Sequence, residues 1–326
     1  MQALKVEALT DDLAGVALVD CAEPTREHGE VLIRVHAASL NFPDLLMTRG
    51  EYQFKPKLPF ISGLECAGEV IEAAPESGFA PGERVMGGQK IGGFAEIASI
   101  PAKGLSLIPE DLTYAEAAAM GAAYSTGYTG LIELGGLKPG QWILVHGASG
   151  GVGLAAVDLA KAIGAKVIAA TGVAAKRERI EQFYSPDAVI VAEGRFREQI
   201  SEITGGALCD IVFDPVGGDV FDESTRCVAF NGKLIVVGFT GGRIANIATN
   251  IPLIKGFSVV GLRAGEYARR FPGRGRAINA AVAKMAQEGQ IKPAIDRILP
   301  LSAWRKGFEA MANRELVGKV VFEPGS

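Results

Sequence analysis

The sequence predicts a doubly wound parallel α/β sheet joined to a second, mostly β region, and three observations carry this prediction. From Trp142 onward, short apolar runs alternate with amphipathic helical segments, which is the order that builds a parallel sheet from βαβ units. Residues 1 to about 110 instead hold short strand patterns separated by Gly and Pro, typical of a partly open barrel. The chain has 326 residues and is 48% hydrophobic, which is enough for two cores.

The first region contains few helical patterns. Residues 31–37 (VLIRVHA) alternate as a half-buried strand does, and residues 66–73 and 94–100 are further predicted strands. The best short helix in this region is predicted at 42–49. An alanine-rich helix is predicted at 114–120 with Thr113 as its N-cap, and a helical pattern continues over 122–134.

The second region repeats strand and helix in regular order. The predicted strands are 142–146, 166–170, 188–191, 210–213 and 233–237, with a sixth at 257–261. The helices predicted between them are 152–163, 176–184, 196–204 and 220–228. Such an order predicts a parallel, doubly wound sheet.

The remaining tail is too short for a domain of its own, so we expect it to complete the first region. Its predicted elements are a helix at 275–288, a strand at 295–299, a helix at 303–312 and a strand at 319–322. The predicted division is therefore 1–122 for the first part of the mostly β domain, 123–260 for the doubly wound domain and 261–326 for the return segment.

A glycine turn between the first strand and first helix of the second region predicts a nucleotide site. The turn fits the dinucleotide fingerprint as Ala148-x-Gly150-x-x-Gly153, with alanine where the first glycine usually stands. Gly150 would let the backbone approach a pyrophosphate, and Gly153 would let the helix pack closely on the strand. The helix N-terminus would attract the anion through its free N–H groups and its dipole.

The same turn also matches a different motif. Residues 147–151 (GASGG) fit G-x-S-x-G, the nucleophile elbow of α/β-hydrolases. A hydrolase of that kind needs a histidine after the serine in chain order. The three histidines, His28, His36 and His146, all precede Ser149, so the elbow lacks its general base.

The end of the second strand predicts which nucleotide binds. NAD-binding units usually carry an Asp or Glu there to hold the ribose 2′-OH. This chain has Thr171 and Gly172 instead, followed by Lys176, Arg177 and Arg179. Cations can pair with a 2′-phosphate, so we expect NADPH rather than NADH, with Lys176 as the main phosphate contact. The alternative is that these cations are ordinary solvated residues.

The sequence predicts no metal site. A catalytic zinc needs three protein ligands, and the candidate residues are few and scattered. Leu64 stands in Gly63-Leu64-Glu65 where a histidine ligand would be expected, and the four cysteines are far apart. Without a metal, an acyl nucleophile or a redox thiol, the hydride of the cofactor is left as the reactive agent.

Charge and composition limit the classes of binding partner and the cellular location that we expect. The net charge of −4 gives no reason to expect a nucleic acid or a membrane surface as partner, and no apolar run approaches the length of a membrane span. Few cysteines, no glycosylation sequon and no apolar signal-peptide core lead us to expect a reducing, cytoplasmic location.

The chain resembles the medium-chain dehydrogenase/reductase superfamily, and within it the zinc-free quinone oxidoreductases that include zeta-crystallin. The resemblance covers essentially the whole chain. Its most specific segments are 41–44 (NFPD), 50–52 (GEY), 59–65 (PFISGLE), 118–131 (AAMGAAYSTGYTGL), 146–153 (HGASGGVG), 213–217 (FDPVG) and 318–321 (GKVV).

The resemblance implies a GroES-like catalytic domain split around a Rossmann domain, with the active site in the cleft between them. Members transfer a hydride from NADPH to quinones or to conjugated, electron-poor alkenes and carbonyls, and many are homodimers paired through their nucleotide domains. The alternatives are an enoyl-thioester or haloacrylate-type alkene reductase, and a non-catalytic NADPH-binding protein with a structural, sensory or RNA-binding role. The acidic net charge argues against RNA.

The resemblance also implies roles for individual residues. Asn41 and Tyr52 would lie beside the nicotinamide and substrate, and Lys319 would close over the cofactor. The remaining implied cofactor contacts are Thr126 near the nicotinamide, Ala148, Gly150, Gly151, Val152 and Gly153 at the pyrophosphate, Lys176 at the 2′-phosphate, and Phe239, Thr240, Leu262 and Arg263 at the nicotinamide end. Thr171, at the end of the second strand, is a further predicted cofactor residue.

Three of these assignments have alternatives. Asn41 could merely cap the helix that begins at Phe42, and Tyr52 could be a packed loop anchor. Relatives often place a tyrosine at the third-strand exit to contact the 2′-phosphate, whereas this chain has Val191 and Ala192 there, with Arg195 as a substitute. No residue stands out as an obligatory proton donor, and water or Tyr52 could serve.

Overall fold

The computed structural model describes residues 1–325 and divides them into two compact units. Among the described residues, the first unit comprises 1–121 and 295–325, and the second comprises Ala122–Ala294. The expected α/β class, with one parallel and one mostly antiparallel sheet, is confirmed. The return to the first unit occurs at Ile295 rather than at the predicted residue 261.

The late return has a physical cause in the helices after residue 261. Helix α9 is tied to the second unit by a hydrogen bond between Ser125 and Asn279 (3.0 Å), and the Lys292 N–H is donated to Asp158 (2.8 Å). Tyr267 of α8 donates to Glu133 (3.0 Å) in the same unit. The segment 261–294 therefore belongs to the second unit.

The first unit holds a mixed sheet of order β15-β16-β3-β5-β6-β8, with β7 also paired to β3, and a small sheet of order β2-β1-β4. The return segment completes the large sheet, because β16 pairs with β3 through Val321 opposite Ser39. Its elements are β1 (Gln2–Val6), β2 (Val16–Asp20), β3 (Glu30–Ser39), α1 (Phe42–Arg49), β4 (Phe60–Ile61), β5 (Glu65–Ala73), β6 (Arg84–Gly88), β7 (Ile97–Pro101), β8 (Leu105–Leu107), β15 (Ile295–Pro300), α10 (Trp304–Ala312) and β16 (Lys319–Glu323).

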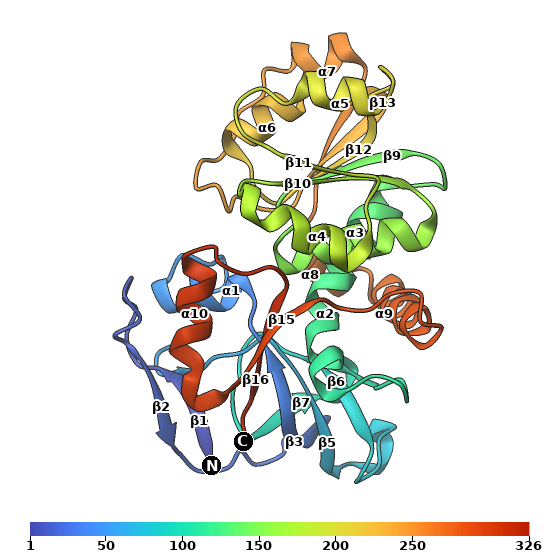
Figure 1. Cartoon of the computed structure of the whole chain (residues 1–326). Coiled ribbons are helices and arrows are strands. Elements are labelled where there is room, and N and C mark those ends of the chain that lie inside the picture. The colour runs from blue at the N-terminus through green and yellow to red at the C-terminus, as the bar shows by residue number, and fades with distance from the viewer. Residues whose placement is uncertain (326) are drawn as a thin grey trace. The chain divides into compact units, whose positions relative to one another are not determined.

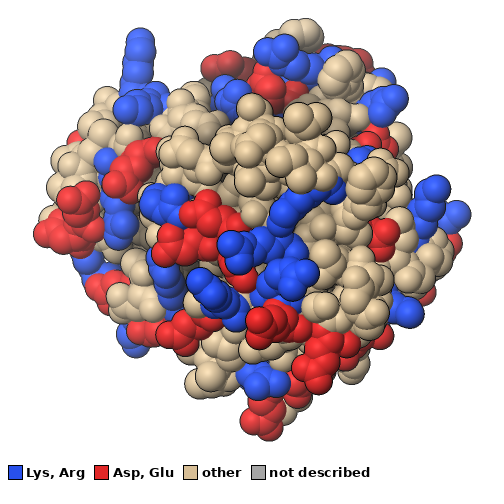
Figure 2. All heavy atoms as spheres, turned by 90° about the horizontal axis from the view of Figure 1, so that it is seen from above, with Lys and Arg blue, Asp and Glu red and all other residues tan. Residues whose placement is uncertain are grey.

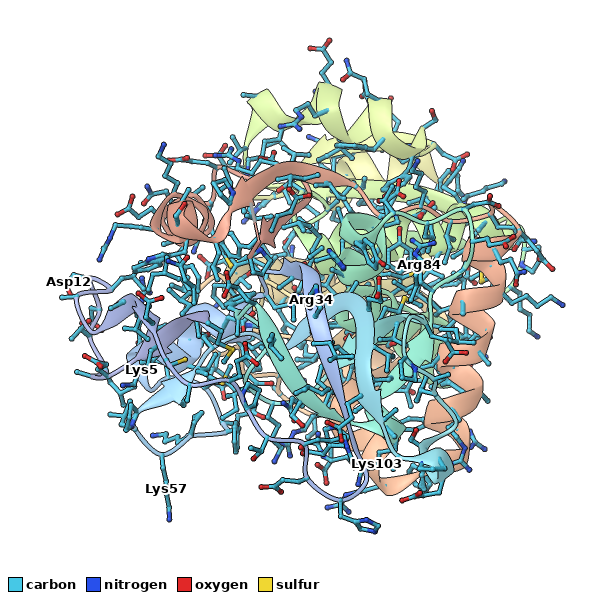
Figure 3. The ribbon with its side chains drawn as sticks, turned by 90° about the horizontal axis from the view of Figure 1, so that it is seen from below. Lys5, Asp12, Arg34, Lys57, Arg84 and Lys103 are labelled. Atoms are coloured by element: carbon cyan, nitrogen blue, oxygen red, sulfur yellow. The ribbon has the colours of Figure 1, made fainter. Side chains whose placement is uncertain are left out.

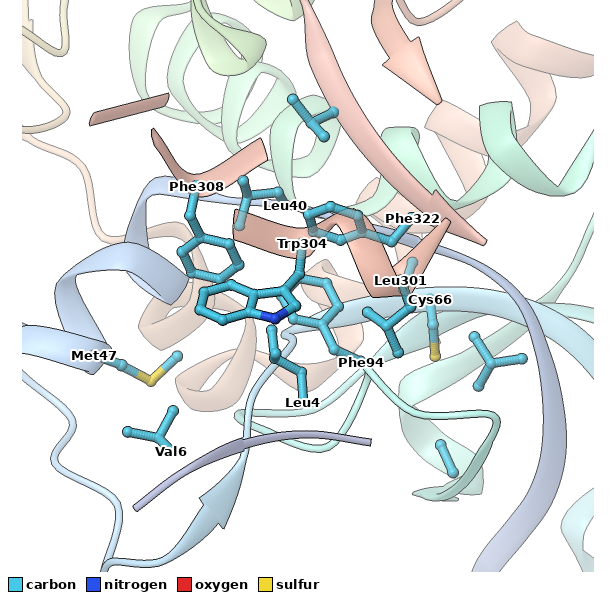
Figure 4. Packing of buried hydrophobic residues seen from close by; sticks show 14 of the residues in the cluster. Leu4, Val6, Leu40, Met47, Cys66, Phe94, Leu301, Trp304, Phe308 and Phe322 are labelled. Carbon is cyan, nitrogen blue, oxygen red and sulfur yellow. The ribbon is translucent and has the colours of Figure 1, made fainter. Parts of the chain in front are cut away.

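Aromatic side chains from both parts of this unit share one core (Figure 4). Phe94 lies edge-on to Phe322, with ring centroids 5.3 Å apart, and Trp304 lies edge-on to Phe308 at 5.7 Å. Such edge-to-face pairs add to the stabilisation from area burial. The return segment is therefore held to the first unit by core packing as well as by the pairing of β16 with β3.

Charged side chains lie at the periphery of the same unit. Lys57 and Asp12, for example, are exposed there (Figure 3).

The second unit holds a parallel sheet of order β11-β10-β9-β12-β13-β14, which is the predicted doubly wound arrangement. Strands β10 and β11 are added on one side of β9, and β12 to β14 on the other, so β9 and β12 flank the switch point of the strand order. Its elements are β9 (Trp142–Val145), α3 (Gly151–Ile163), β10 (Lys166–Thr171), α4 (Arg177–Tyr184), β11 (Ala188–Val191), α5 (Arg197–Ile203), β12 (Cys209–Asp214), α6 (Gly218–Ser224), β13 (Val228–Val236), α7 (Asn250–Lys255), β14 (Ser258–Gly261), α8 (Ala264–Arg270) and α9 (Pro272–Gln287).

Two helix predictions need correction. The segments predicted at 114–120 and 122–134 form one helix, α2 (Tyr114–Tyr128), which continues as a π-helix over Thr129–Gly135. The predicted N-cap is confirmed, since Glu116 N–H is donated to Thr113 Oγ1 (3.2 Å). Helix α6 ends at Ser224 rather than at residue 228, because Val228 already begins strand β13.

Candidate functional site

The glycine turn after β9 ends in an open helix N-terminus. Gly150 is the N-cap of α3, and the first intrahelical hydrogen bond runs from Leu154 N to Gly150 O (2.9 Å). The N–H groups of Gly151, Val152 and Gly153 therefore precede the helix's own hydrogen bonds. These donors and the helix dipole together form an anion site.

The turn leaves room for a ligand on one side and is tightly packed on the other. A Cβ atom added at Gly150 would meet only Gly147 O, at 3.4 Å, so the space beyond this residue is open. A Cβ at Gly153 would lie 2.2 Å from the same oxygen, so α3 packs against the turn as closely as predicted. The sequence interpretation did not assign Gly147, which supplies the left-handed backbone of the turn with φ +58°.

Ala148 has a packing role in this turn. Its side chain is buried, and its N–H is donated to Ala170 O of β10 (3.0 Å). This hydrogen bond ties the turn to the second strand. The N–H donors that face a pyrophosphate would therefore come from the residues after Gly150.

The second strand ends without a carboxylate. Thr171 is buried, and its hydroxyl accepts the Val173 N–H (3.2 Å). No acidic residue occurs between Thr171 and Lys176, which is half-buried at the end of a short 3₁₀ turn. Arg177 begins α4 and is exposed. The cations follow the strand as the sequence predicted.

Other predicted cofactor residues lie at the carboxyl edge of the same sheet. Thr240 follows β13, and both its N–H and its hydroxyl donate to Pro215 O at 3.0 Å. Leu262 follows β14 and is buried, with Phe239 and Arg263 exposed beside these strand ends. The carboxyl ends of parallel strands share one edge with the glycine turn, which is where doubly wound sheets bind ligands. Thr126 is partly exposed on α2, and its place at the nicotinamide stays a prediction.

Sequence reasoning missed the side chain that shapes this edge. Asp214, at the end of β12, is buried, and its Oδ1 accepts the N–H groups of Val216 (2.8 Å) and Gly217 (2.9 Å). Burial raises the pKa of this carboxyl. The signal was present in the segment FDPVG, where an Asp that ends a strand precedes a turn.

In the first unit, Asn41, Glu65 and Lys319 form a buried polar cluster. The Lys319 ammonium lies 3.0 Å from Glu65 Oε1 and donates to Asn41 Oδ1 (2.7 Å), and Asn41 Nδ2 donates to Glu65 Oε1 (2.8 Å). Lys319 is 5% exposed and Glu65 4%. The sequence predicted Asn41 and Lys319 as separate site residues and gave no role to Glu65. In the structure, Glu65 is hydrogen-bonded to both of them.

Asp44 adds a second carboxyl to this region. Asn41 occupies the N-cap of α1, and its N–H is donated to Asp44 Oδ2 (2.8 Å), while the Asp44 N–H is donated to the Asn41 backbone oxygen (3.0 Å). Burial raises the pKa of Asp44 to about 8, against the opposing effects of the Asn41 N–H and the Lys319 charge. A protonated Asp44 adds no second negative charge beside Glu65.

We expect Asp44→Asn to change how stability depends on pH. The pKa of Asp44 in the folded protein is about 8, above its unfolded value near 3.8, so its stabilising contribution is lost as pH rises towards 8. Urea unfolding from pH 5 to 9 should show the wild type losing up to about 1.4 kcal/mol per pH unit relative to the isosteric variant, with the loss levelling off above pH 8. Asp20→Asn, at an exposed site, is the control; parallel curves for wild type and Asp44→Asn would contradict a neutral Asp44.

Tyr52 follows α1 and is half-buried, and its ring packs against the core of the first unit. This contact is what the packed-anchor alternative predicts. A role at the substrate remains a prediction for this residue.

Within residues 1–325, no group of three or more His, Cys, Asp and Glu side chains is arranged to hold a metal ion. In the same range, no helix is both long and apolar enough to cross a membrane. On the face shown in Figure 2, acidic and basic side chains are interspersed rather than gathered by sign.

Two family models match the chain. Residues 27–110 match the alcohol dehydrogenase GroES-like domain, and residues 151–285 match the zinc-binding dehydrogenase domain. Together with the doubly wound sheet and its glycine turn, these matches define a two-domain dehydrogenase/reductase of the medium-chain type.

Individual relatives narrow the class. Quinone oxidoreductase-like protein 2 homolog of Nematostella vectensis is 36% identical over 300 residues, which span 90% of this chain and 81% of that protein. A probable oxidoreductase from Mycobacterium abscessus is 35% identical with a TM-score of 0.91, covering 99% of both chains. The quinone oxidoreductase of Thermus thermophilus, solved also with NADPH, is 28% identical with a TM-score of 0.83, covering 99% of this chain and 100% of that one. The chain belongs to the medium-chain dehydrogenase/reductase superfamily, within the family of quinone oxidoreductases and quinone oxidoreductase-like proteins.

Proposed function

We propose that the protein is a zinc-independent, NADPH-dependent oxidoreductase that transfers a hydride to quinones or to conjugated, electron-poor alkenes and carbonyls. The observation that carries the proposal is the open N-terminus of α3 at the carboxyl edge of the sheet, next to a second strand that ends in Thr171 instead of an acid. The NADPH complex of the Thermus thermophilus relative supports the same cofactor.

The residues of the turn fit a dinucleotide. The N–H groups of Gly151 to Gly153 would hold the pyrophosphate, and the open space at Gly150 would admit it. Lys176 would pair with the 2′-phosphate. When bound, NADPH supplies the hydride. This chain's residues would orient its nicotinamide end, with Asn41 and Tyr52 beside it.

Cofactor selectivity tests the role of Lys176. We expect NADPH to bind at least about tenfold more tightly than NADH, and Lys176→Ala to weaken NADPH about tenfold while leaving NADH unchanged, because only NADPH carries the 2′-phosphate. Quenching of protein fluorescence during titration gives both dissociation constants. Lys284→Ala, at an exposed position of α9, is the matched control. Equal loss for both nucleotides, or no loss, would remove Lys176 as the selector.

A substrate panel tests the reaction class. NADPH consumption should be fast with 9,10-phenanthrenequinone or 1,4-benzoquinone, and a metal chelator should not slow it. Turnover only with enoyl thioesters or haloacrylates would support the alkene reductase instead. NADPH binding without turnover of any of these compounds would favour the non-catalytic alternative.

We also propose a homodimer paired through the second unit. Strand β14 is the edge of its sheet, and large apolar side chains lie exposed near it, namely Phe230 (84%), Leu253 (80%) and Ile254 (75%). Phe230 lies against Gly256, directly after α7, so these residues form one patch. An unpaired edge beside an apolar patch is suited to pairing with a second copy.

Light scattering after size-exclusion chromatography measures the assembly. We expect twice the 34.1 kDa of one chain, and we expect Leu253→Asp to shift the protein towards the monomer because a charge would have to be buried. Leu107→Asp, at an exposed apolar position of the first unit, should leave the dimer intact. A monomeric wild type would contradict the proposed pairing.

A further inference from the structure

A buried carboxyl of the second unit binds two segments that are far apart in the sequence. Asp158 lies on α3, and its Oδ2 accepts the hydroxyl of Tyr124 on α2 (2.5 Å) and the backbone N–H of Lys292 (2.8 Å). The second unit runs from Ala122 to Ala294. Asp158 therefore joins the segment through which the chain enters this unit to the segment through which it leaves.

The segment that ends the unit relies on side chains for its hydrogen bonds. Residues 291–294 follow α9 and form neither helix nor strand, yet three of them are buried, namely Ile291, Pro293 and Ala294. Buried backbone groups need partners. Asp158 accepts the N–H of Lys292, and the hydroxyl of Tyr184 on α4 donates to the Lys292 carbonyl oxygen (2.6 Å). Both backbone groups of Lys292 are thus bound by side chains.

The two tyrosines act as donors in this arrangement. Burial raises the pKa of Tyr124 and of Tyr184, so both hydroxyls keep their hydrogens at neutral pH. Tyr124 gives its hydrogen to Asp158 and Tyr184 gives its hydrogen to Lys292, and the two hydroxyl oxygens lie 3.4 Å apart. Because Oδ2 of Asp158 faces two donors, a proton taken up by this carboxyl resides on Oδ1.

We propose that Asp158 is a proton-dependent clasp that fastens residues 291–294 to α3, and that these residues open together, separately from the sheet, when the clasp is released. Release removes the hydrogen bond to the Lys292 N–H and exposes the carboxyl to water. Segments outside helix and strand are the usual sites of such local opening. Since Ile295 already belongs to the first unit, the clasp controls how freely the chain moves where it leaves the second unit.

The proton favours the closed clasp. Burial raises the pKa of Asp158 from its ordinary value of 3.8 to about 6, against the opposing effects of the Tyr124 hydroxyl and the Lys292 N–H. In the opened segment the carboxyl meets water and its pKa returns towards 3.8. Opening therefore becomes easier as pH rises from about 4 to about 6, and changes little above that.

Other charged groups around Asp158 are few and accounted for. Tyr124 and Tyr184 stay protonated, and the exposed Lys292 presents its backbone to the carboxyl. One turn along α3, Lys161 pairs with Asp187 (3.1 Å). Burial acts on Asp187 too, but hydrogen bonds from the Val167 N–H and from Lys161 outweigh it and hold the pKa of this carboxyl below its usual value.

Hydrogen exchange between pH 4 and 7 tests the proposal. After correction for the intrinsic rate at each pH, protection of the Lys292 amide should fall by about 100-fold over this range, because pKa values of about 6 and 3.8 correspond to roughly that ratio of proton affinities. Asp158→Asn carries no titratable group and should not show this fall. The Val167 amide, donated to Asp187 (2.8 Å), is the internal control, and its protection should not fall with pH.

Two further variants separate the clasp from the stability of the whole unit. Asp158→Ala removes the acceptor, and Tyr184→Phe removes the donor to the Lys292 oxygen while keeping the ring. Each should lower protection in residues 291–294 by about tenfold or more at pH 5, and only Tyr184→Phe should keep the dependence on pH. Asp187→Asn should leave this segment as it is in the wild type.

The amides of β9 and β12 show whether the opening is local. In the wild type they should stay better protected than residues 291–294 at every pH. Equal protection in the strands and in the segment would mean that exchange requires unfolding of the whole unit, and would overturn the proposal. So would wild-type protection of Lys292 that does not change between pH 4 and 7, or a Tyr184→Phe segment as protected as that of the wild type.

Discussion

Gly153→Ala is expected to weaken NADPH binding by about tenfold or more and to lower the free energy of unfolding by about 1–3 kcal/mol. The added Cβ would lie 2.2 Å from Gly147 O and 2.7 Å from its carbonyl carbon, and both are backbone atoms that cannot rotate away. To relieve the contact, α3 has to move from the turn, and the N–H groups of its first turn move with it. Fluorescence titration with NADPH and urea unfolding measure the two effects.

A second glycine provides the control. Gly273 lies in the first turn of α9, and a Cβ there would meet nothing within 4 Å. Gly273→Ala should therefore bind NADPH as the wild type does and be slightly more stable, by up to about 1 kcal/mol, through helix propensity. Equal behaviour of the two alanine variants would contradict the close packing of α3 on the turn.

Lys319→Met is expected to lower the free energy of unfolding by about 3–5 kcal/mol. The substitution leaves Glu65 buried with its charge but without the ammonium at 3.0 Å, and it also removes the donor to Asn41 Oδ1. Methionine keeps a similar apolar length, so the loss reports the broken pair rather than a large cavity. Chemical denaturation at neutral pH measures it.

A double variant that removes both buried charges is the control for that experiment. Glu65→Gln with Lys319→Met should be more stable than Lys319→Met alone, because no uncompensated charge remains buried. A Lys319→Met protein as stable as the wild type would show that the ion pair contributes nothing to stability.

The doubly wound sheet could be predicted because its signals are local. Most of its strands are short apolar runs, and the glycine turn at Gly150 and Gly153 lies within a few residues of strand and helix. The sequence also indicated Lys176 and the missing acid at Thr171, since both follow directly from the end of β10. These features depend on spacing along the chain.

The cluster in the first unit could not be found in this way. Asn41, Glu65 and Lys319 are brought together by strand pairing across β5, β3 and β16, and nothing in the local sequence of Glu65 or Asp44 marks a buried carboxyl. The position of the return to the first unit was wrong for a similar reason. An amphipathic pattern over residues 275–288 predicts a helix but does not say which core covers its apolar face.

We propose that this chain transfers a hydride from NADPH to a quinone, and a single-turnover experiment tests this proposal directly. Excess protein and NADPH are mixed anaerobically with limiting 9,10-phenanthrenequinone, and NADPH absorbance is followed, once with ordinary NADPH and once with NADPH deuterated at the transferred position. We predict rapid loss of one equivalent of NADPH per quinone, slowed by deuterium. A sample in which NADPH binds, as shown by fluorescence, but is not oxidised would contradict the claim.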